Sequence, residues 1–321
     1  MLKGLDDVQW LGSAYENDQE FLPLLIRDLT SPDPHTRRRS LESLRNRINH
    51  QGTIYESSVQ AVPFLIELIT IDSIEDKHEI MGLLGIFACP HSPKDGDLGV
   101  RLRTVVQQGY PIYTALLDDD DPRIRRRALG LAVSCLETFE EKAALVKSFL
   151  AQETVSELIE SAIGVFEGLF KSHRLDQQAK SIWVDYFRGY LTRRISPDIK
   201  VAALEVLFVI FGEDNSPDDL LEEFFRQVRI SDEVGSRNRF YCYNYLVGKF
   251  SLPKRVDILL RLIYESHPYS PRNEYYNVLL DQTLDVSAEL LTPGSPSPEQ
   301  VKVWNAIAYD YDLWDSLPAL S

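Results

Sequence analysis

The chain has 321 residues, of which 44% are hydrophobic and 26% charged, and this is ample material for a large buried core. No run of about 18 apolar residues occurs, so the sequence predicts no membrane-spanning helix. The formal net charge of −15 repels phosphate backbones and disfavours nucleic-acid binding, because that affinity rests largely on lysine and arginine.

Two segments of the chain carry the same pattern of residue types in the same register. Residues 23–41 and residues 111–129 each contain a proline, an Asp-Pro pair, an arginine triplet and a leucine. In both segments, apolar residues at helical spacing stop at an acidic break, which indicates the end of a first helix. The Asp-Pro pairs at Asp33 and Asp121 then begin a second helix, because the carboxylate caps it and proline suits its first turn. Two helices make one repeat, so we expect a stack of helical hairpins.

This pattern resembles the HEAT repeat, an armadillo-type helical hairpin with a proline in its first helix, an aspartate in the turn and an arginine opening the second helix. The matching positions are Pro23, Asp33, Arg37, Pro111, Asp119 or Asp121, and Arg125. A degenerate copy lies between the two clear ones, with a first helix at residues 62–69 and a second helix at about residues 76–87. Residues 50–59 also resemble a sequence segment found in bacterial HEAT-repeat proteins.

The resemblance implies an all-α fold, a right-handed α-solenoid of about seven antiparallel helix pairs. Apolar spacing and proline breaks predict further helices after the second clear copy. They cover residues 140–151, 154–171, 176–194, 198–212, 217–229, 236–250, 254–265, 272–291 and 298–309. Because each repeat packs on its neighbours, we expect a single domain over residues 1–321. Within it we expect clear repeats at 20–137, divergent repeats at 138–291 and a capping segment at 292–321.

The ends and the cysteines of the chain bear on its location and chemistry. The first residues lack the apolar segment of a signal peptide, so we expect a cytoplasmic protein. Cys89, Cys135 and Cys242 lie far apart in apolar or aromatic stretches, as reduced core thiols do. The histidines lack metal-ligand spacing, and no phosphate-binding glycine loop or Gly-x-Ser-x-Gly motif occurs. We therefore predict no metal site, no cofactor and no enzymatic activity.

The two arginine triplets, with Arg45, Arg47 and Arg123 near them, form basic clusters on the second helices. The resemblance implies that Arg37 and Arg125 pair with turn aspartates of neighbouring repeats and form a ladder along the stack. The arginines that this ladder leaves over are our candidates for contact with an anionic patch. They are Arg38, Arg39, Arg126 and Arg127.

Four consecutive aspartates precede the second arginine triplet. The run lacks the alternating ligands and the following glycine of an EF-hand loop, whereas acids before a helix are explained by capping and the helix dipole. Asp118 and Asp120 therefore form either a solvated turn or a contact for a basic partner.

The most enzyme-like cluster consists of His50, Tyr55 and Glu56. A histidine and a glutamate can share a proton, and Gly52 allows the loop between them to turn tightly. The alternative is structural, because this stretch joins one hairpin to the next. There a histidine can cap a helix and a tyrosine can fill the gap between repeats.

Aromatic residues are dense in the second half of the chain. Consecutive aromatics such as Tyr275 and Tyr276 point in different directions from a helix, so some of them are exposed. Residues 236–276, with Arg237 and Arg239, are therefore a candidate recognition face. The alternative is an interhelical core rich in tyrosine.

Three classes of function remain open. The leading one is a non-catalytic, monomeric scaffold, such as an immunity protein or an adaptor, that binds a basic protein partner through the solenoid surface. The second is an enzyme that resembles the helical-repeat DNA glycosylases of alkylated bases, which requires a basic groove faced by a tryptophan and an aspartate. The third resembles bilin lyases and chaperones built from HEAT repeats.

Overall fold

The computed structural model describes residues 2–15, 18–88 and 96–212, with scattered positions between 215 and 305. The chain divides into two compact units, Met1–Ala162 and Ile163–Ser321. The boundary falls inside the helix α9, Ser156–Ser172, and the single domain with its clear, divergent and capping segments stays a prediction. Arg237, Arg239 and Tyr275 lie outside the described residues, as do most positions of the helices expected after residue 212.

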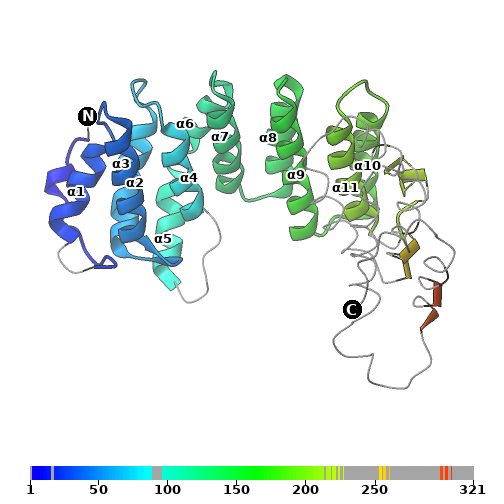
Figure 1. Cartoon of the computed structure of the whole chain (residues 1–321), viewed down its shortest axis with the longest axis horizontal. Helices are drawn as coiled ribbons and strands as arrows, with labels where there is room; N and C mark the ends of the chain where they lie inside the picture. The colour runs from blue at the N-terminus through cyan, green and yellow to red at the C-terminus, as the bar shows by residue number, and fades with distance from the viewer. Residues whose placement is uncertain are drawn as a thin grey trace, which may run out of the picture. The chain divides into compact units, whose positions relative to one another are not determined.

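The first unit is built from helices that pack on one another along the chain (Figure 1). Helix α1 packs on α2, α3 on α4 and α5, α4 on α7, α6 on α7, and α7 on α8. This stacking confirms the expected all-α helical solenoid. The helices are α1 Asp18–Asp28, α2 Pro34–Ile48, α3 Glu56–Ile69, α4 Lys77–Ala88, α5 Gly96–Gln107, α6 Tyr110–Ala115, α7 Pro122–Cys135, α8 Phe139–Gln152 and α9 Ser156–Ser172, with 3-10 turns η1 Leu5–Asp7 and η3 Leu116–Asp118.

Helices α2 and α7 begin at the two Asp-Pro pairs, as the sequence predicts. The Asp33 carboxylate accepts hydrogen bonds from the backbone N–H of His35 at 3.2 Å and of Thr36 at 3.0 Å. The Asp121 carboxylate accepts one from the backbone N–H of Arg123 at 2.8 Å. In both helices the proline stands in the first turn, where its missing N–H costs no intrahelical hydrogen bond. The matching caps place both arginine triplets within the first two turns of second helices.

Helix α5 is an element that the repeat pattern does not predict. It lies in the chain between α4 and α6, so the two clear copies of the motif are separated by one helical hairpin, α3 and α4, and by an additional helix. Gly96 and Gly99 in its first turn lower the helix propensity of this segment and weaken its signal. Leu102 and Val106, one helical turn apart, are both buried and anchor α5 in the core.

A short β-hairpin also departs from the purely helical expectation. Strand β1, Asn49–His50, pairs antiparallel with β2, Thr53–Ile54. The turn residues Gln51 and Gly52 have φ angles of 51° and 81°, and positive φ at both positions is the requirement of a tight type I′ turn. The expected tight turn at Gly52 is therefore confirmed.

The apolar residues of α2 differ in how deeply they are buried. Leu44 and Ile48 are fully buried, as are Leu22 and Ile26 of the facing helix α1. Leu41, one turn before Leu44 on the same helix, is only partly buried. It packs against the edge of the core and contributes to the groove described below.

The second unit contains α10 Gln177–Leu191 and α11 Pro197–Phe211, which pack on each other. Phe166 packs closely against Trp183 and Phe187, with ring centroids 4.8 Å and 5.1 Å apart, so this aromatic group is core.

In the first unit, Cys135 is a half-buried free thiol, and burial raises its pKa to about 11. Within the described helices, none combines the length and the apolar character needed to cross a bilayer.

Candidate functional site

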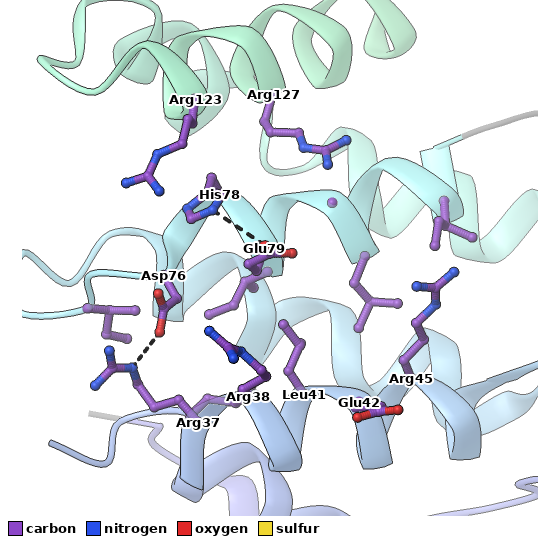
Figure 2. A pocket seen from close by; sticks show the side chains of 16 residues that line it. Arg37, Arg38, Leu41, Glu42, Arg45, Asp76, His78, Glu79, Arg123 and Arg127 are labelled. Carbon is purple, nitrogen blue, oxygen red and sulfur yellow. Dashed lines mark hydrogen bonds and ion pairs between the residues drawn. The ribbon is translucent and has the colours of Figure 1, made fainter. Parts of the chain in front are cut away.

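A groove of about 640 Å³ lies over α2, α4 and α7 of the first unit (Figure 2). Its apolar lining includes Leu41, Ile80, Leu83 and Ile86. Its arginines are Arg37, Arg38, Arg45, Arg123 and Arg127, and its carboxylates are Glu42, Asp76 and Glu79. Figure 2 shows Arg38 and Arg45 extending from α2, and Arg123 and Arg127 extending from α7, toward the space over α4.

Helical spacing explains which arginines share this groove. Arg38 and Arg45 lie two turns apart on α2, and Arg123 and Arg127 lie one turn apart on α7, so each pair shares a helix face. Successive residues of a helix point about 100° apart, because each turn holds about 3.6 residues. Arg39, which follows Arg38, and Arg126, which precedes Arg127, are accordingly absent from the groove lining, whereas Arg37 contributes to it at one end.

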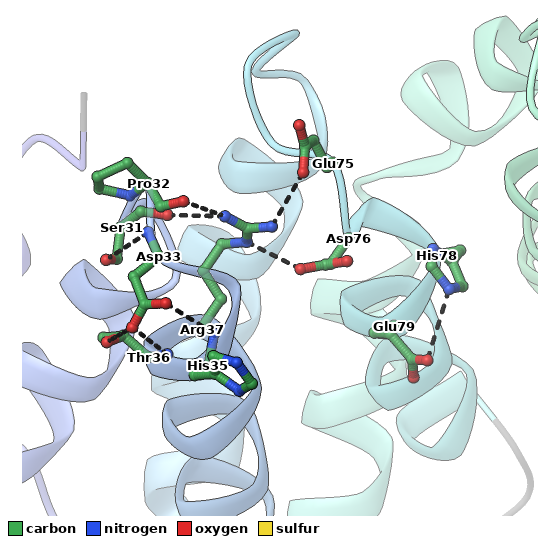
Figure 3. A network of polar contacts seen from close by, with 10 residues as sticks. All are labelled: Ser31, Pro32, Asp33, His35, Thr36, Arg37, Glu75, Asp76, His78 and Glu79. Carbon is green, nitrogen blue, oxygen red and sulfur yellow. Dashed lines mark hydrogen bonds and ion pairs between the residues drawn. The ribbon is translucent and has the colours of Figure 1, made fainter.

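One end of the groove is closed by Arg37, whose side chain is 8% exposed (Figure 3). Its Nε donates to Oδ2 of Asp76 at 2.8 Å, and its Nη2 donates to Oε2 of Glu75 at 3.2 Å. Its Nη1 donates to the backbone carbonyls of Ser31 and Pro32 at 3.0 and 3.1 Å. The expected pairing of this arginine with an aspartate of the next hairpin is confirmed. Arg37 thereby ties α2 to the start of α4.

Arg125 makes the same connection one step further along the chain, but to a glutamate. Its Nε and Nη2 donate to the two carboxylate oxygens of Glu153 at 2.8 and 2.9 Å, and its Nη1 donates to the carbonyl of Asp119 at 2.8 Å. Burial acts to raise the pKa of Glu153, but hydrogen bonds from Arg125 and from backbone N–H groups outweigh it and lower that pKa. The aspartate expected here is thus replaced by Glu153, whose longer side chain reaches back from the turn after α8.

The remaining groove arginines differ in whether a carboxylate pairs with their positive charge. Arg123 pairs with Asp121 at 2.7 Å, and this hydrogen bond lowers the pKa of the Asp121 carboxyl. Among the described residues, Arg38, Arg45 and Arg127 have no hydrogen-bond or ion-pair partner, and all three are exposed.

The groove is therefore positive within an acidic chain. The side chains that line it, five arginines and three carboxylates, carry a formal charge of +2 with His78 neutral, whereas the whole chain carries −15. Two of these arginines, Arg37 and Arg123, also pair with Glu75 and Asp121 outside the lining, so the positive charge comes from Arg38, Arg45 and Arg127. Glu79 contacts His78, with 3.5 Å between Oε1 and Nε2. Arg127 lies across Gly82, since its Cζ is 3.5 Å from the position that a Cβ would take there. The missing side chain at Gly82 leaves room for this guanidinium over α4.

The arginines proposed from the sequence divide into two pairs. Arg38 and Arg127 line the groove, although they come from different repeats. Arg39 and Arg126 are exposed and lie outside the groove lining. The groove thus brings together one arginine of each triplet.

The His50, Tyr55 and Glu56 cluster is not assembled as the acid–base interpretation requires. His50 Nδ1 lies 3.5 Å from the hydroxyl of Tyr15, and the two rings meet edge to face. Glu56 instead accepts hydrogen bonds from Arg101 of α5, one of them 2.8 Å long, and these lower the pKa of Glu56. The interpretation in which His50 and Glu56 share a proton is wrong for this conformation.

Asp118 and Asp120 line a second hollow of about 480 Å³, beside α8. Asp118 and Asp120 are exposed, whereas the carbonyl of Asp120 accepts a hydrogen bond from Arg125 Nη1 at 3.1 Å. In the part of the chain that the structure describes, no group of three or more candidate ligands is arranged to hold a metal ion. Contact of this turn with a basic partner stays a prediction.

Comparison with known proteins identifies no family for this chain. No protein-family model and no curated protein matches it. An engineered protein solved by the Northeast Structural Genomics Consortium is 16% identical over 91% of this chain and 78% of its own, with a TM-score of 0.39. Kap121p, solved bound to Nup53p, is 15% identical over 95% of this chain, also with a TM-score of 0.39, and the chain spans only 38% of Kap121p. Assignment to the HEAT repeat and a bacterial origin stay predictions.

Sequence reasoning missed Arg45, Arg123 and Glu79 as members of the site. Arg45 and Arg123 stand seven positions and four positions from Arg38 and Arg127, so helical spacing was the signal that could have found them. Glu79 belongs to the degenerate repeat, where the absence of an arginine triplet removes any such signal. Its place in the groove follows only from the packing of α4 on α7.

Proposed function

We propose that the chain is a non-catalytic scaffold that binds another protein through the groove over α2, α4 and α7. The observation that carries this proposal is the set of exposed guanidinium groups of Arg38, Arg45 and Arg127, which have no partner among the described residues. They stand beside partly buried apolar side chains such as Leu41 and Ile86. Arginine next to exposed apolar surface is typical of protein interfaces.

The proposal also covers the partner protein, which as a whole we propose to be basic. A chain with a net charge of −15 attracts a basic macromolecule at long range, which raises the encounter rate, while the groove determines which segment docks. We propose that the chain acts in this way as a cytoplasmic, monomeric immunity protein or adaptor.

The groove gives less support to the DNA glycosylase alternative. That alternative requires a tryptophan and an aspartate facing the groove. Within the described part of the chain, no tryptophan lines the groove, and Asp76, the aspartate there, is engaged by Arg37.

Affinity purification from cells that express the chain natively tests the proposal, with three forms of the full chain as bait. The wild-type chain and the variant R39E/R126E should recover the same stoichiometric protein partner, whereas R38E/R127E should lose it. Both variants replace two exposed arginines on the same two helices and change the net charge equally, so non-specific charge effects cancel. If the wild-type chain recovers no stoichiometric protein, the scaffold proposal is wrong.

A further inference from the structure

We infer that the groove over α2, α4 and α7 accepts a peptide segment that is acidic and carries an apolar side chain. This inference rests on the proposed function and specifies the chemistry of the segment that docks. It concerns the local contact, which is opposite in sign to the charge of the chain as a whole.

The floor of the groove is apolar, and part of it is accessible to solvent. Ile80 and Leu83 of α4 are 2% and 3% exposed and belong to the core, whereas Leu41 of α2 and Ile86 of α4 remain partly accessible. Covering such accessible apolar surface is favourable, because it removes that surface from water. A docked segment therefore gains by placing an apolar side chain between α2 and α4.

Cations flank this floor from two sides. Arg38 and Arg45 stand on α2 and Arg127 stands on α7, and all three lack a carboxylate partner in the described ranges. Arg37 and Arg123, in contrast, are already paired with Asp76 and Asp121. Each unpaired guanidinium group is planar and presents two parallel N–H donors, which suit a two-point contact with a carboxylate. Charge complementarity therefore favours carboxylates on both sides of the apolar anchor.

Two observations favour a peptide over a nucleic acid. Glu42 and Glu79 lie in the groove and repel a continuous phosphate backbone, whereas a peptide can place its carboxylates selectively. Apart from His78, no aromatic ring of the described residues lines the groove, and single-stranded nucleic acids bind largely by stacking on aromatic side chains. The mixed lining fits separate carboxylates better than a row of phosphates.

An array of random peptides, probed with the labelled full-length chain, tests the inference even while the native partner is unidentified. We expect the bound peptides to be enriched in Asp and Glu beside Leu, Ile or Phe. The best of them, measured by fluorescence anisotropy, should bind R38E/R127E at least about tenfold more weakly and R39E/R126E within about twofold of wild type. Binding should also weaken as salt rises from about 0.05 to about 0.5 M. Circular dichroism checks that both variants remain helical.

Several outcomes would overturn the inference. They are enrichment of basic peptides, no enrichment by charge, equal weakening by both variants, or tighter binding of a single-stranded oligonucleotide than of the best acidic peptide. If the array fails in one of these ways while the native partner is still lost with R38E/R127E, the proposed function stands and only the chemistry of the segment is wrong. If no native partner is recovered at all, the proposed function itself fails.

Discussion

Arg125 and Glu153 form a two-point ion pair that joins the start of α7 to the turn after α8, with donor–acceptor distances of 2.8 and 2.9 Å. The Glu153 side chain is 3% exposed, and the third contact of Arg125, to the carbonyl of Asp119, holds the guanidinium in the turn before its own helix. Arg37 does the same for α2 and α4 through Asp76. Each arginine thus donates to carbonyls in the turn before its own helix and to a carboxylate further along the chain.

Replacing Arg125 with alanine should destabilise the first unit. The substitution leaves the Glu153 carboxylate buried without its cation, which costs about 2–4 kcal/mol of unfolding free energy. Urea unfolding measures this loss. The neighbouring R126A removes an exposed arginine from the same helix and should change stability by less than about 0.5 kcal/mol. Equal losses in the two variants would contradict the ladder.

The ion pair between Arg125 and Glu153 should make the free energy of unfolding depend on pH in the acidic range. The folded-state pKa of Glu153 lies below its ordinary value of 4.5, so the unfolded chain binds the proton more readily. The stabilisation is fully present above about pH 5 and is lost as the pH falls through the lower folded-state pKa. E153Q should therefore lower the unfolding free energy most at neutral pH, and its difference from wild type should shrink below about pH 4. A pH-independent difference in urea midpoints would show that Glu153 has no such role.

Gly109 should tolerate no side chain. A Cβ at this position would stand 2.4 Å from the hydroxyl oxygen of Tyr113, which is fully buried and donates to the carbonyl of Val106 at 3.1 Å. G109A should cost about 1–3 kcal/mol, because Tyr113 or the backbone must move. The control G130A adds the same methyl to α7, where nothing lies within 4 Å, and should stabilise by about 0.5–1 kcal/mol. Thermal unfolding distinguishes the two, and a neutral G109A would contradict the close contact.

Releasing Arg123 should strengthen peptide binding. In D121N the amide still caps α7, because Asn and Asp cap helices about equally well, but the ion pair with Arg123 is lost. The freed guanidinium adds a cation to the groove, and the acidic peptide selected on the array should bind about two- to fivefold more tightly. Fluorescence anisotropy at low salt measures this change. Unchanged or weaker binding by a variant with an intact helix content would speak against an electrostatic role for the groove.

Much of the structure of the first unit can be predicted from the sequence, because the residues that determine its helix boundaries are close together in the chain. The Asp-Pro caps at Asp33 and Asp121 act within one helical turn, so both helix starts were predictable from neighbouring residues. Helix α5 was not, because two glycines weaken its local signal and its burial depends on α3 and α4. Glu56 illustrates the same limit, since its partner is Arg101 of that helix rather than the nearby His50.

The sequence by itself determined the helical repeat, the caps and the identity of the ladder arginines Arg37 and Arg125. It also named four surplus arginines without separating those that share a surface. Tertiary packing decided that Arg38 and Arg127 face one groove while Arg39 and Arg126 do not. The physical reason is that helix caps depend on residues within a turn. The groove depends on how α2, α4 and α7 are rotated against one another by the packing of their buried faces.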